Sequence, residues 1–317
     1  MDQSTETPTK RIYIAPLQGF TDHFFRAAFI PAFGNPEAAF APFIETHKLG
    51  PRSYRDVLPE RNAGCNLIPQ IMGNNATEIL PVIEQLQEMG YGEINWNLGC
   101  PYPMVTKRKM GAGLLPFPDR IDAILNEVHS HIQCRLSVKM RLGLTDGNDW
   151  RALVPVLNRY PLSEVIVHGR TASQMYKGQV DEPAFGEISH QLQHPVCFNG
   201  NVASLDDFNR LAALFPDVSR WMIGRGLLSN PLLMREIQTG EKAEVEEVHK
   251  VIEQLHELLL YQYSTKFNGD SHVFNKIKPY WEYFNLAFPG KEKYLKKIKK
   301  TVALRAYLMS CNELFRS

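Results

Sequence analysis

Eight short apolar segments, separated mostly by helical segments, occupy the first three quarters of the chain, and this alternation constrains the fold more than any other feature. Eight strands that alternate with helices and then stop are typical of an α/β protein with a closed (β/α)8 (TIM) barrel. We expect the strands at residues 11–15, 38–45, 66–71, 92–97, 135–141, 164–168, 195–199 and 220–223. The helices between them are expected at 21–29, 77–89, 119–131, 150–160, 183–192 and 205–215.

The last quarter of the chain has a different pattern. Apolar residues recur at helical spacing between Val248 and Leu259 and again between Leu304 and Cys311. The 317 residues give room for one large domain and one small domain. We therefore expect a disordered tail at 1–10, a barrel domain at 11–240 and a small helical bundle at 241–317.

Positive charge is concentrated at the end of the chain. Residues 291–317 hold eight basic residues and two glutamates, which gives a net charge of +6. Because the whole chain has a net charge of +1, the other 290 residues have a net charge of −5. A local basic patch indicates a nucleic-acid partner, but it is also the pattern of an ordinary solvated helix face. The expected helix places Leu295, Ile298 and Val302 on its apolar side. The lysines on the opposite face are Lys293, Lys296, Lys297 and Lys300.

The five cysteines are odd in number, widely spread and without the spacing of a zinc site, so we expect neither disulfides nor a metal. The first residues, MDQSTETPTKR, lack the apolar core of a signal peptide. No apolar run is long enough to cross a bilayer. The sequence therefore predicts a cytoplasmic protein without a membrane partner.

The stretch INWNLGCPYPMVTKRKMGAGLL, at residues 94–115, indicates chemistry most strongly. It begins as a strand and breaks around Cys100, where a glycine permits unusual backbone angles and a proline cannot continue the ladder. Most lone cysteines are small buried hydrophobes, but these neighbours favour an ordered loop. Asn97 offers an amide for the edge of a heterocycle, and Cys100 offers a thiol that can donate a proton.

Every expected strand ends in a polar residue or a glycine turn, as the rim of a barrel active site would. Asn199-Gly200-Asn201 and Gly224-Arg225-Gly226 follow the seventh and eighth strands, where such barrels bind phosphate. Glycines let backbone N–H groups approach an anion and Arg225 adds a charged fork, although plain tight turns are the alternative. His168 and Arg170, at the end of the sixth strand, are expected to face the same rim.

Two further polar residues fall within or at the end of apolar strands. Lys139 lies inside one, where a buried ammonium needs an anionic or electron-rich partner such as the N1–C2=O edge of a flavin. Gln70 is expected to end the third strand, where its amide can hydrogen-bond the edge of a flavin ring.

These motifs occur in a recognisable order over residues 11–240. They are APLQGFTD at 15–22 with FR at 25–26, NLGCP at 97–101 with GAG at 111–113, VKMRLG at 138–143, VHGRT at 167–171, NG at 199–200 and MIGRG at 222–226. The chain thereby resembles the bacterial tRNA-dihydrouridine synthases, FMN enzymes that reduce uridine in transfer RNA. Leu17 replaces the usual Met of that family, and Asn201 stands where the family often has Asp.

The resemblance implies a set of site residues, with Cys100 as the catalytic proton donor. The residues implied to bind FMN are Pro16, Leu17, Gln18, Gln70, Lys139, Asn199, Gly200, Asn201, Gly224 and Arg225, with His168 close by. Those assigned to the substrate are Asn97, Arg141, Arg170, Tyr176, Lys107 and the tail lysines Lys293, Lys296, Lys297 and Lys300.

The resemblance also implies the reaction. NADPH reduces FMN, hydride passes from flavin N5 to uracil C6, and Cys100 gives a proton to C5 of a uridine turned out of the RNA fold. An ordinary thiol pKa of about 8.5 leaves Cys100 protonated near neutral pH, so we do not expect an activated thiolate. The expected partner is tRNA and not DNA, and the expected state is a monomer. Ribosomal RNA or a free pyrimidine, as in dihydroorotate dehydrogenases, are alternative substrates.

Overall fold

The computed structural model describes residues 10–317, so the expected tail at 1–10 lies outside the described residues except for Lys10. Its centre is one parallel sheet with the strand order β3-β5-β6-β7-β8-β9-β10-β1-β2-β4. The strands are β1 (Arg11–Ile14), β2 (Ala38–Phe40), β3 (Ile44–Glu45), β4 (Leu67–Ile68), β5 (Gln70–Met72), β6 (Glu93–Leu98), β7 (Arg135–Gly143), β8 (Val165–Thr171), β9 (Val196–Asn199) and β10 (Arg220–Ile223).

These ten strands occupy the eight positions of a closed barrel. Pro42 separates β2 from β3, and Pro69 separates β4 from β5, because proline cannot donate a ladder hydrogen bond. The two halves of each interrupted strand pair with the corresponding halves of the other, β2 with β4 and β3 with β5. The two ends of the strand order therefore meet, and the expected (β/α)8 barrel is confirmed with its second and third strands interrupted.

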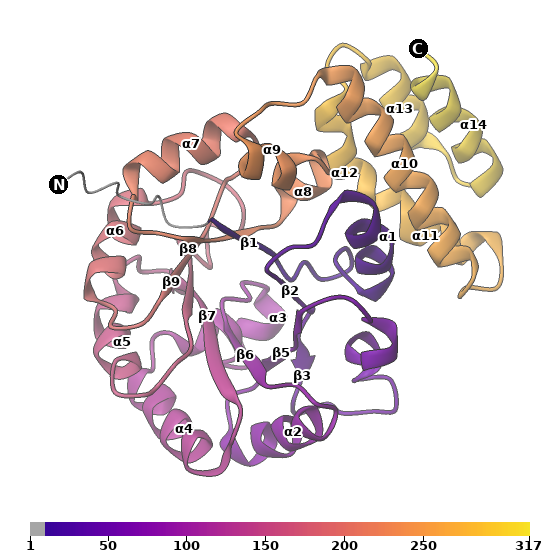
Figure 1. The fold of residues 1–317 in the computed structure, drawn as a ribbon. Coiled ribbons are helices and arrows are strands. Elements are labelled where there is room, and N and C mark those ends of the chain that lie inside the picture. Colours follow the sequence, from indigo (N-terminus) through magenta and orange to yellow (C-terminus); the bar gives the residue numbers. More distant parts are fainter. Residues whose placement is uncertain (1–9) are drawn as a thin grey trace.

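Helices surround the barrel (Figure 1). Side-chain caps fix the starts of several of them: Asp22 accepts hydrogen bonds from two backbone N–H groups of α1, and Ser204 caps α7. The helices are α1 (His23–Phe33), α2 (Ala76–Glu88), α4 (Pro118–His131), α5 (Asp149–Leu157), α6 (Glu182–Gln191), α7 (Leu205–Leu214), α8 (Arg225–Ser229) and α9 (Leu233–Thr239), with short turns η1 (Arg55–Val57), η2 (Pro59–Arg61), α3 (Pro103–Thr106) and η3 (Gly111–Leu114) in the loops.

Two layers of apolar side chains hold the barrel together. The larger layer lies between the strands and the surrounding helices, as the alternation of side chains along each strand requires. A smaller cluster fills the interior, with Tyr13, Phe40, Ile166 and Met222 among its members. Tyr13 also donates a hydrogen bond to buried Glu164, 3.2 Å away. Side chains thus fill the barrel interior, and a site can form only at the carboxyl ends of the strands.

The helical tail is the orange-to-yellow group beside α1 in Figure 1. Its elements are α10 (Val245–Ser264), α11 (Asp270–Ile277), η4 (Lys278–Tyr280), α12 (Trp281–Phe284), η5 (Asn285–Ala287), α13 (Glu292–Lys300) and α14 (Leu304–Phe315). α10 packs along α1, and α12 packs against α8. The buried hydroxyl of Tyr280 donates to the backbone carbonyl of Phe20, 2.6 Å away in the β1–α1 loop, so the tail is tied directly to the barrel rim.

The structure corrects three details of the expected elements. Gln70 begins β5 instead of ending its strand, because Pro69 interrupts that strand. β7 continues to Gly143, two residues beyond its expected end at Arg141, so that Lys139 lies at its middle and not near its end. Val302 is 89% exposed and not part of an apolar helix face, because α13 already ends at Lys300.

No helix within residues 10–317 is both long and apolar enough to span a membrane.

Candidate active site

A cavity opens at the carboxyl ends of the barrel strands. Residues from nearly every strand end contribute to it, and the tail contributes Tyr283 of α12. The expected site residues that line it are Pro16, Leu17, Gln18, Asn97, Cys100, Lys139, Arg141, His168, Tyr176, Asn199, Gly200, Gly224 and Arg225. Thirteen of the predicted residues, spread over more than 200 positions of sequence, therefore converge on one space.

The loop after β6 holds Cys100 through the side chain of Asn97. Asn97 Oδ1 accepts hydrogen bonds from the backbone N–H groups of Gly99, at 2.9 Å, and Cys100, at 2.8 Å. Gly111 closes the loop from the other side, since a Cβ at this position would lie 2.8 Å from Cys100 Cβ. Gly111 also has a φ of +53°, which favours glycine. Asn97 and Gly111 therefore hold the backbone of Cys100 from two sides, which explains their spacing in the sequence.

The thiol of Cys100 is buried, with only 6% of the residue exposed. It packs with Met72 and Met110 in a small cluster beneath the cavity. Burial raises the pKa of Cys100, and a backbone hydrogen bond from Tyr102 and the positive charge of Arg141 only partly oppose this rise. Cys100 is therefore a protonated thiol at neutral pH and can act as an acid but not as a ready nucleophile.

Gln70 lies below the cavity and does not line it. Its Oε1 accepts from Asn97 Nδ2 at 2.7 Å, and its Nε2 donates to Asn95 Oδ1 at the same distance. Asn95 in turn donates to Ser137. All four side chains are buried. Gln70 thus orients Asn97 and takes no part in the cavity lining, in contrast to the expectation that it binds a ligand directly.

Four cationic side chains gather around His168. Lys139, Arg141 and Arg225 line the cavity, and Arg170 lies behind it. The lining, formed from the part of the chain that the structure describes, contains no Asp or Glu. Like charges held together in a partly buried space favour an anionic ligand that neutralises them. The cavity is therefore suited to a ligand with phosphate or another delocalised negative charge.

Lys139 is half-buried in the cavity wall, whereas Arg141 and Arg170 are buried. Its Nζ donates to Asn199 Oδ1 at 2.7 Å. Burial lowers the pKa of Lys139 to about 7, and the positive charge of Arg141 contributes in the same direction. An ammonium with only a neutral amide as partner is costly to keep charged, so an electron-rich ligand at this point would restore its charge.

His168 is neutral in this environment. Burial lowers the pKa of its imidazole well below the ordinary value, and the charges of Arg141, Lys139 and Arg170 lower it further. Its Nε2 lies 3.1 Å from Arg170 Nη1, which is always a donor. A neutral ring that accepts at Nε2 carries its proton on Nδ1, so His168 has one N–H left to donate. Arg170 therefore positions His168 and does not itself line the cavity.

Tyr176 lies at the mouth of the cavity between two guanidinium groups. Arg141 and Arg225 lie over its ring at 5.4 and 5.1 Å from the ring centre. The loop that carries Tyr176 is held by Arg141, which donates to the carbonyl of Met175 at 2.7 Å. The ring is thus fixed by cation–π contacts and presents an aromatic wall to any ligand.

Several lining residues were not expected from the sequence. They include Phe20, Phe43, Tyr102 and Tyr283, which add aromatic surface to the mouth. Tyr102 directly follows the cysteine motif, and its position next to Pro101 was an available signal. Tyr283 had no such signal, because it comes from the helical tail and reaches the site only through the packing of α12 on the barrel.

The remaining expected residues lie elsewhere. Asn201 accepts from Arg225 at 2.9 Å and supports that side chain from outside the cavity. Lys107 is exposed on the loop after β6. Lys299 of α13 is exposed, and so are all four expected lysines of that helix: Lys293, Lys296, Lys297 and Lys300. Lys297 pairs with Glu313 at 2.6 Å, so its charge is partly neutralised.

Comparisons with known proteins agree with this arrangement. The chain is 29% identical over 240 residues to a tRNA-dihydrouridine(16) synthase of Ralstonia nicotianae, with 72% of each chain covered. It is 24% identical to an enzyme of the same name from Vibrio parahaemolyticus, with 91% of each chain covered. It is 28% identical to tRNA-dihydrouridine synthase B of Pasteurella multocida, over 72% of this chain and 69% of that protein.

The barrel itself is shared more widely. Morphinone reductase in complex with tetrahydroNAD superposes with a TM-score of 0.53 at 9% identity, over 74% of this chain and 88% of that one. At this identity the likeness shows the fold alone. The family model described as dihydrouridine synthase matches residues 13–315. Because this match extends over nearly the whole chain, the protein belongs to the dihydrouridine synthase family.

Proposed function

We propose that this protein reduces a uridine of tRNA to 5,6-dihydrouridine, with FMN as its bound cofactor and NADPH as the reductant. The observation that carries the proposal is the meeting, in one barrel-rim cavity, of a protonated buried cysteine with a carboxylate-free group of cations. The names of the curated relatives support tRNA as the substrate.

The residues of the cavity fit FMN. Gly200 and Gly224 expose backbone to the cavity, and Arg225 lies next to them with a fork suited to a phosphate. Lys139, half-buried with only an amide partner, suits the electron-rich edge of a flavin ring. When bound, FMN supplies the hydride. Pro16, Leu17 and Gln18 would complete its binding site from the β1–α1 loop.

Cys100 supplies the second hydrogen of the reduction. Saturating the C5–C6 double bond of uracil requires one hydride and one proton, and we assign the hydride to C6 and the proton to C5. A thiol whose pKa is raised by burial keeps its proton at neutral pH and can release it to a developing carbanion at C5. Solvent returns a proton to the thiolate afterwards.

Three residues orient the uracil in this proposal. Asn97 has used both lone pairs of Oδ1 and one N–H, which leaves one N–H free to reach a uracil carbonyl. Arg141 and Tyr176 lie at the cavity mouth and offer a charged donor and an aromatic face. A uridine enters such a cavity only when its base leaves the stack of the RNA.

The test is a dihydrouridine assay on unmodified tRNA transcripts with purified protein, FMN and NADPH. We expect wild type to form dihydrouridine and Cys100→Ala to lose at least about 100-fold in rate, the usual scale for removing a general acid. Cys100→Ala should still bind FMN, which absorbance measures. A Cys100→Ala enzyme as active as wild type would contradict the acid role.

The substrate has its own control. Parallel reactions with ribosomal RNA, free uridine and orotate distinguish the alternatives. If free pyrimidine gives product and tRNA gives none, the protein is a small-molecule oxidoreductase. If only ribosomal RNA gives product, the substrate is ribosomal RNA and not tRNA.

A further inference from the structure

A second cationic cluster lies outside the cavity, on the segment between β3 and β4. This segment leaves the barrel at the carboxyl end of β3, so it starts from the rim that carries the active site. It carries Lys48, Arg52, Arg55 and Arg61 but only two carboxylates, Asp56 and Glu60. Neither η1 nor η2 within it contributes to the cavity lining.

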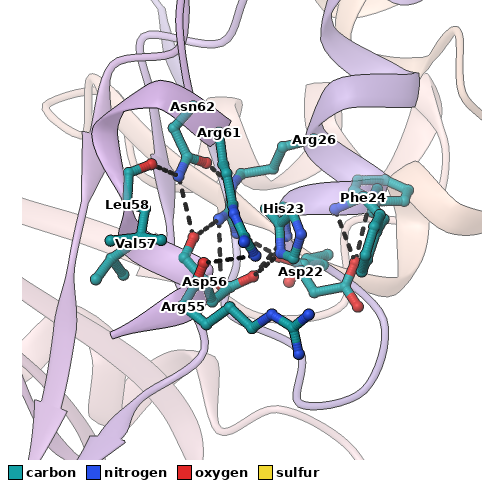
Figure 2. A network of polar contacts seen from close by, with 12 residues as sticks. Asp22, His23, Phe24, Arg26, Arg55, Asp56, Val57, Leu58, Arg61 and Asn62 are labelled. Carbon is teal, nitrogen blue, oxygen red and sulfur yellow. Dashed lines mark hydrogen bonds and ion pairs between the residues drawn. The ribbon is translucent and has the colours of Figure 1, made fainter. Parts of the chain in front are cut away.

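Figure 2 shows how this segment is anchored to α1. Asp56 Oδ1 accepts from the backbone N–H of His23 at 2.6 Å, and its Oδ2 pairs with buried Arg26 at 3.1 Å. Asn62 Oδ1 accepts from Arg26 Nε at 3.0 Å, and its amide donates to the carbonyl of Leu58. The fold of the segment is therefore fixed by Asp56 and Asn62, with Asp56 fully engaged on the inner side.

The anchoring leaves the neighbouring arginines without acidic partners. Within residues 10–317, the guanidinium of Arg55 has no hydrogen-bond acceptor, and Arg61 reaches only the carbonyl of Arg55, at 3.4 Å. Glu60 forms no ion pair with either. The anchoring contacts thus hold the two arginines in place and engage the half-buried carboxylate of Asp56 on the side of α1.

The helical tail adds a third cation to the same place. Phe267, just past α10, packs on Phe24 of α1 with ring centres 5.9 Å apart, and His23 beside Phe24 is bonded to Asp56. This brings the exposed Lys266 next to the arginines. The pKa of Lys266 is lowered, chiefly by the charge of Arg55, then by desolvation and the charge of Arg61. The three positive charges therefore lie close enough to repel one another.

We propose that Arg55, Arg61 and Lys266 form a phosphate-binding surface for the backbone of the RNA substrate, built jointly by the barrel and the helical tail. The two guanidinium groups are half-buried at the surface and the ammonium group is exposed, a spread of cations that suits successive backbone phosphates better than one small anion. The surface is separate from the lysines of α13. The inference rests on the proposed function, since it names further contacts of the same substrate.

The experiment measures tRNA affinity as a function of salt. The triple variant Arg55→Gln, Arg61→Gln, Lys266→Gln is compared with a matched variant that removes three arginines from the amino-terminal end of the barrel: Arg11→Gln, Arg135→Gln and Arg159→Gln. Both variants lose the same charge. Wild type is assayed for uridine reduction with the same tRNA.

A contact to one phosphate contributes about 0.7–0.9 to the slope of log Kd against log salt. In the triple variant of Arg55, Arg61 and Lys266 we expect this slope to be smaller by about 2. We also expect this variant to bind tRNA about tenfold more weakly than wild type at low salt. The matched variant should keep the wild-type slope. Flavin absorbance should be unchanged in both, and Lys266→Glu alone, which touches no anchoring contact, should weaken binding in the same direction.

An unchanged slope in the first variant, with wild type active on tRNA, would overturn the inference and leave the proposed function intact. Equal losses in both triple variants would also overturn it, because net charge alone would then explain binding. If wild type neither binds nor reduces tRNA, the proposed function fails and the inference fails with it.

Discussion

Two ionisable residues, Cys100 and Lys139, line the same cavity, and loss of contact with water drives each toward its neutral form. The pKa of Cys100 rises and that of Lys139 falls to about 7, in both cases mainly because charge is costly away from water. Neutrality suits the proposed acid role of the thiol, which requires a bound proton. It does not suit the lysine, whose charge depends on an electron-rich ligand, so ligand binding and the charge of Lys139 are linked.

The Cys100 loop gives a sharp prediction at Gly111. Gly111→Ala adds a Cβ 2.8 Å from Cys100 Cβ at a positive φ, so it displaces the loop that holds the thiol. We expect dihydrouridine formation to fall at least about tenfold, because a misplaced acid loses most of its catalytic effect. Gly90→Ala is the control, since Gly90 has a φ of +92° but free space around it. Similar losses in both variants would contradict a specific effect on Cys100.

Sequence alone predicted the residues whose neighbours in the chain determine their place. Cys100 lies between a glycine and a proline just after a strand, and Gly111 follows at the spacing that the loop requires. Gln70 was predicted at the wrong end of its strand, because the interruption at Pro69 shifts the pairing. The support that Arg170 gives to His168 depends on side-chain geometry, which no spacing rule contains.

At the scale of elements, the prediction succeeded where hydrophobic alternation is regular. All eight barrel positions were expected, and the second and third strands differ mainly in the interruptions at residues 41–43 and at Pro69. The short helices α3 and α8 were missed, because four or five residues carry too little periodicity. The contact between α12 and the rim was missed for a different reason: it depends on how two separately predicted parts pack.

The place of α12 predicts a role for Tyr283 in substrate binding. Its ring meets Phe20 edge-on, with centres 5.0 Å apart, and lines the cavity mouth beside Arg225 and Tyr176. Stacking on one aromatic ring contributes about 1–3 kcal/mol per base, so Tyr283→Ala should raise the KM for tRNA at least about fivefold. Tyr283→Phe should stay near wild type, and NADPH-driven flavin reduction should not change.

An exposed tyrosine provides the control for this prediction. Tyr261, on α10, is 65% exposed and away from the cavity lining. Tyr261→Ala should leave the KM for tRNA unchanged. A Tyr283→Ala enzyme with the wild-type KM would show that α12 closes the cavity without contacting the substrate.

The link between η4 and the β1–α1 loop gives a stability prediction. Tyr280→Phe keeps the buried ring but leaves the carbonyl of Phe20 without its donor. An unsatisfied buried carbonyl costs about 1–3 kcal/mol in the free energy of unfolding. We expect a lower Tm and weaker FMN binding, because Phe20 lies in the same β1–α1 loop as Gln18. Tyr261→Phe is the matched control, and an unchanged Tm in Tyr280→Phe would refute the link.

At the scale of the whole molecule, the cavity belongs to both parts of the chain. The barrel supplies the thiol and the cations, and the tail supplies Tyr283 and fixes the loop at Phe20. The proposed phosphate surface crosses the same boundary. Substrate binding and the docking of the tail are therefore coupled, and conditions that loosen the tail should reduce RNA binding.

Acid is such a condition, because the core of the tail contains a buried histidine. His256 Nε2 lies 2.6 Å from the hydroxyl of Tyr307, at hydrogen-bond distance, and burial lowers the pKa of His256 to about 3. Below a pH of about 6.5, the ordinary pKa of histidine, His256 is protonated in the unfolded chain but stays neutral in the folded tail. The free energy of unfolding therefore falls by about 1.4 kcal/mol for each pH unit. Between pH 7.5 and 5.0 this amounts to about 2 kcal/mol.

Thermal melts should therefore show a smaller acid-induced drop in Tm for His256→Gln, which keeps an acceptor, than for wild type. His190→Gln, at an exposed site on α6, should drop as wild type does, and equal drops in all three would place the acid sensitivity elsewhere in the molecule.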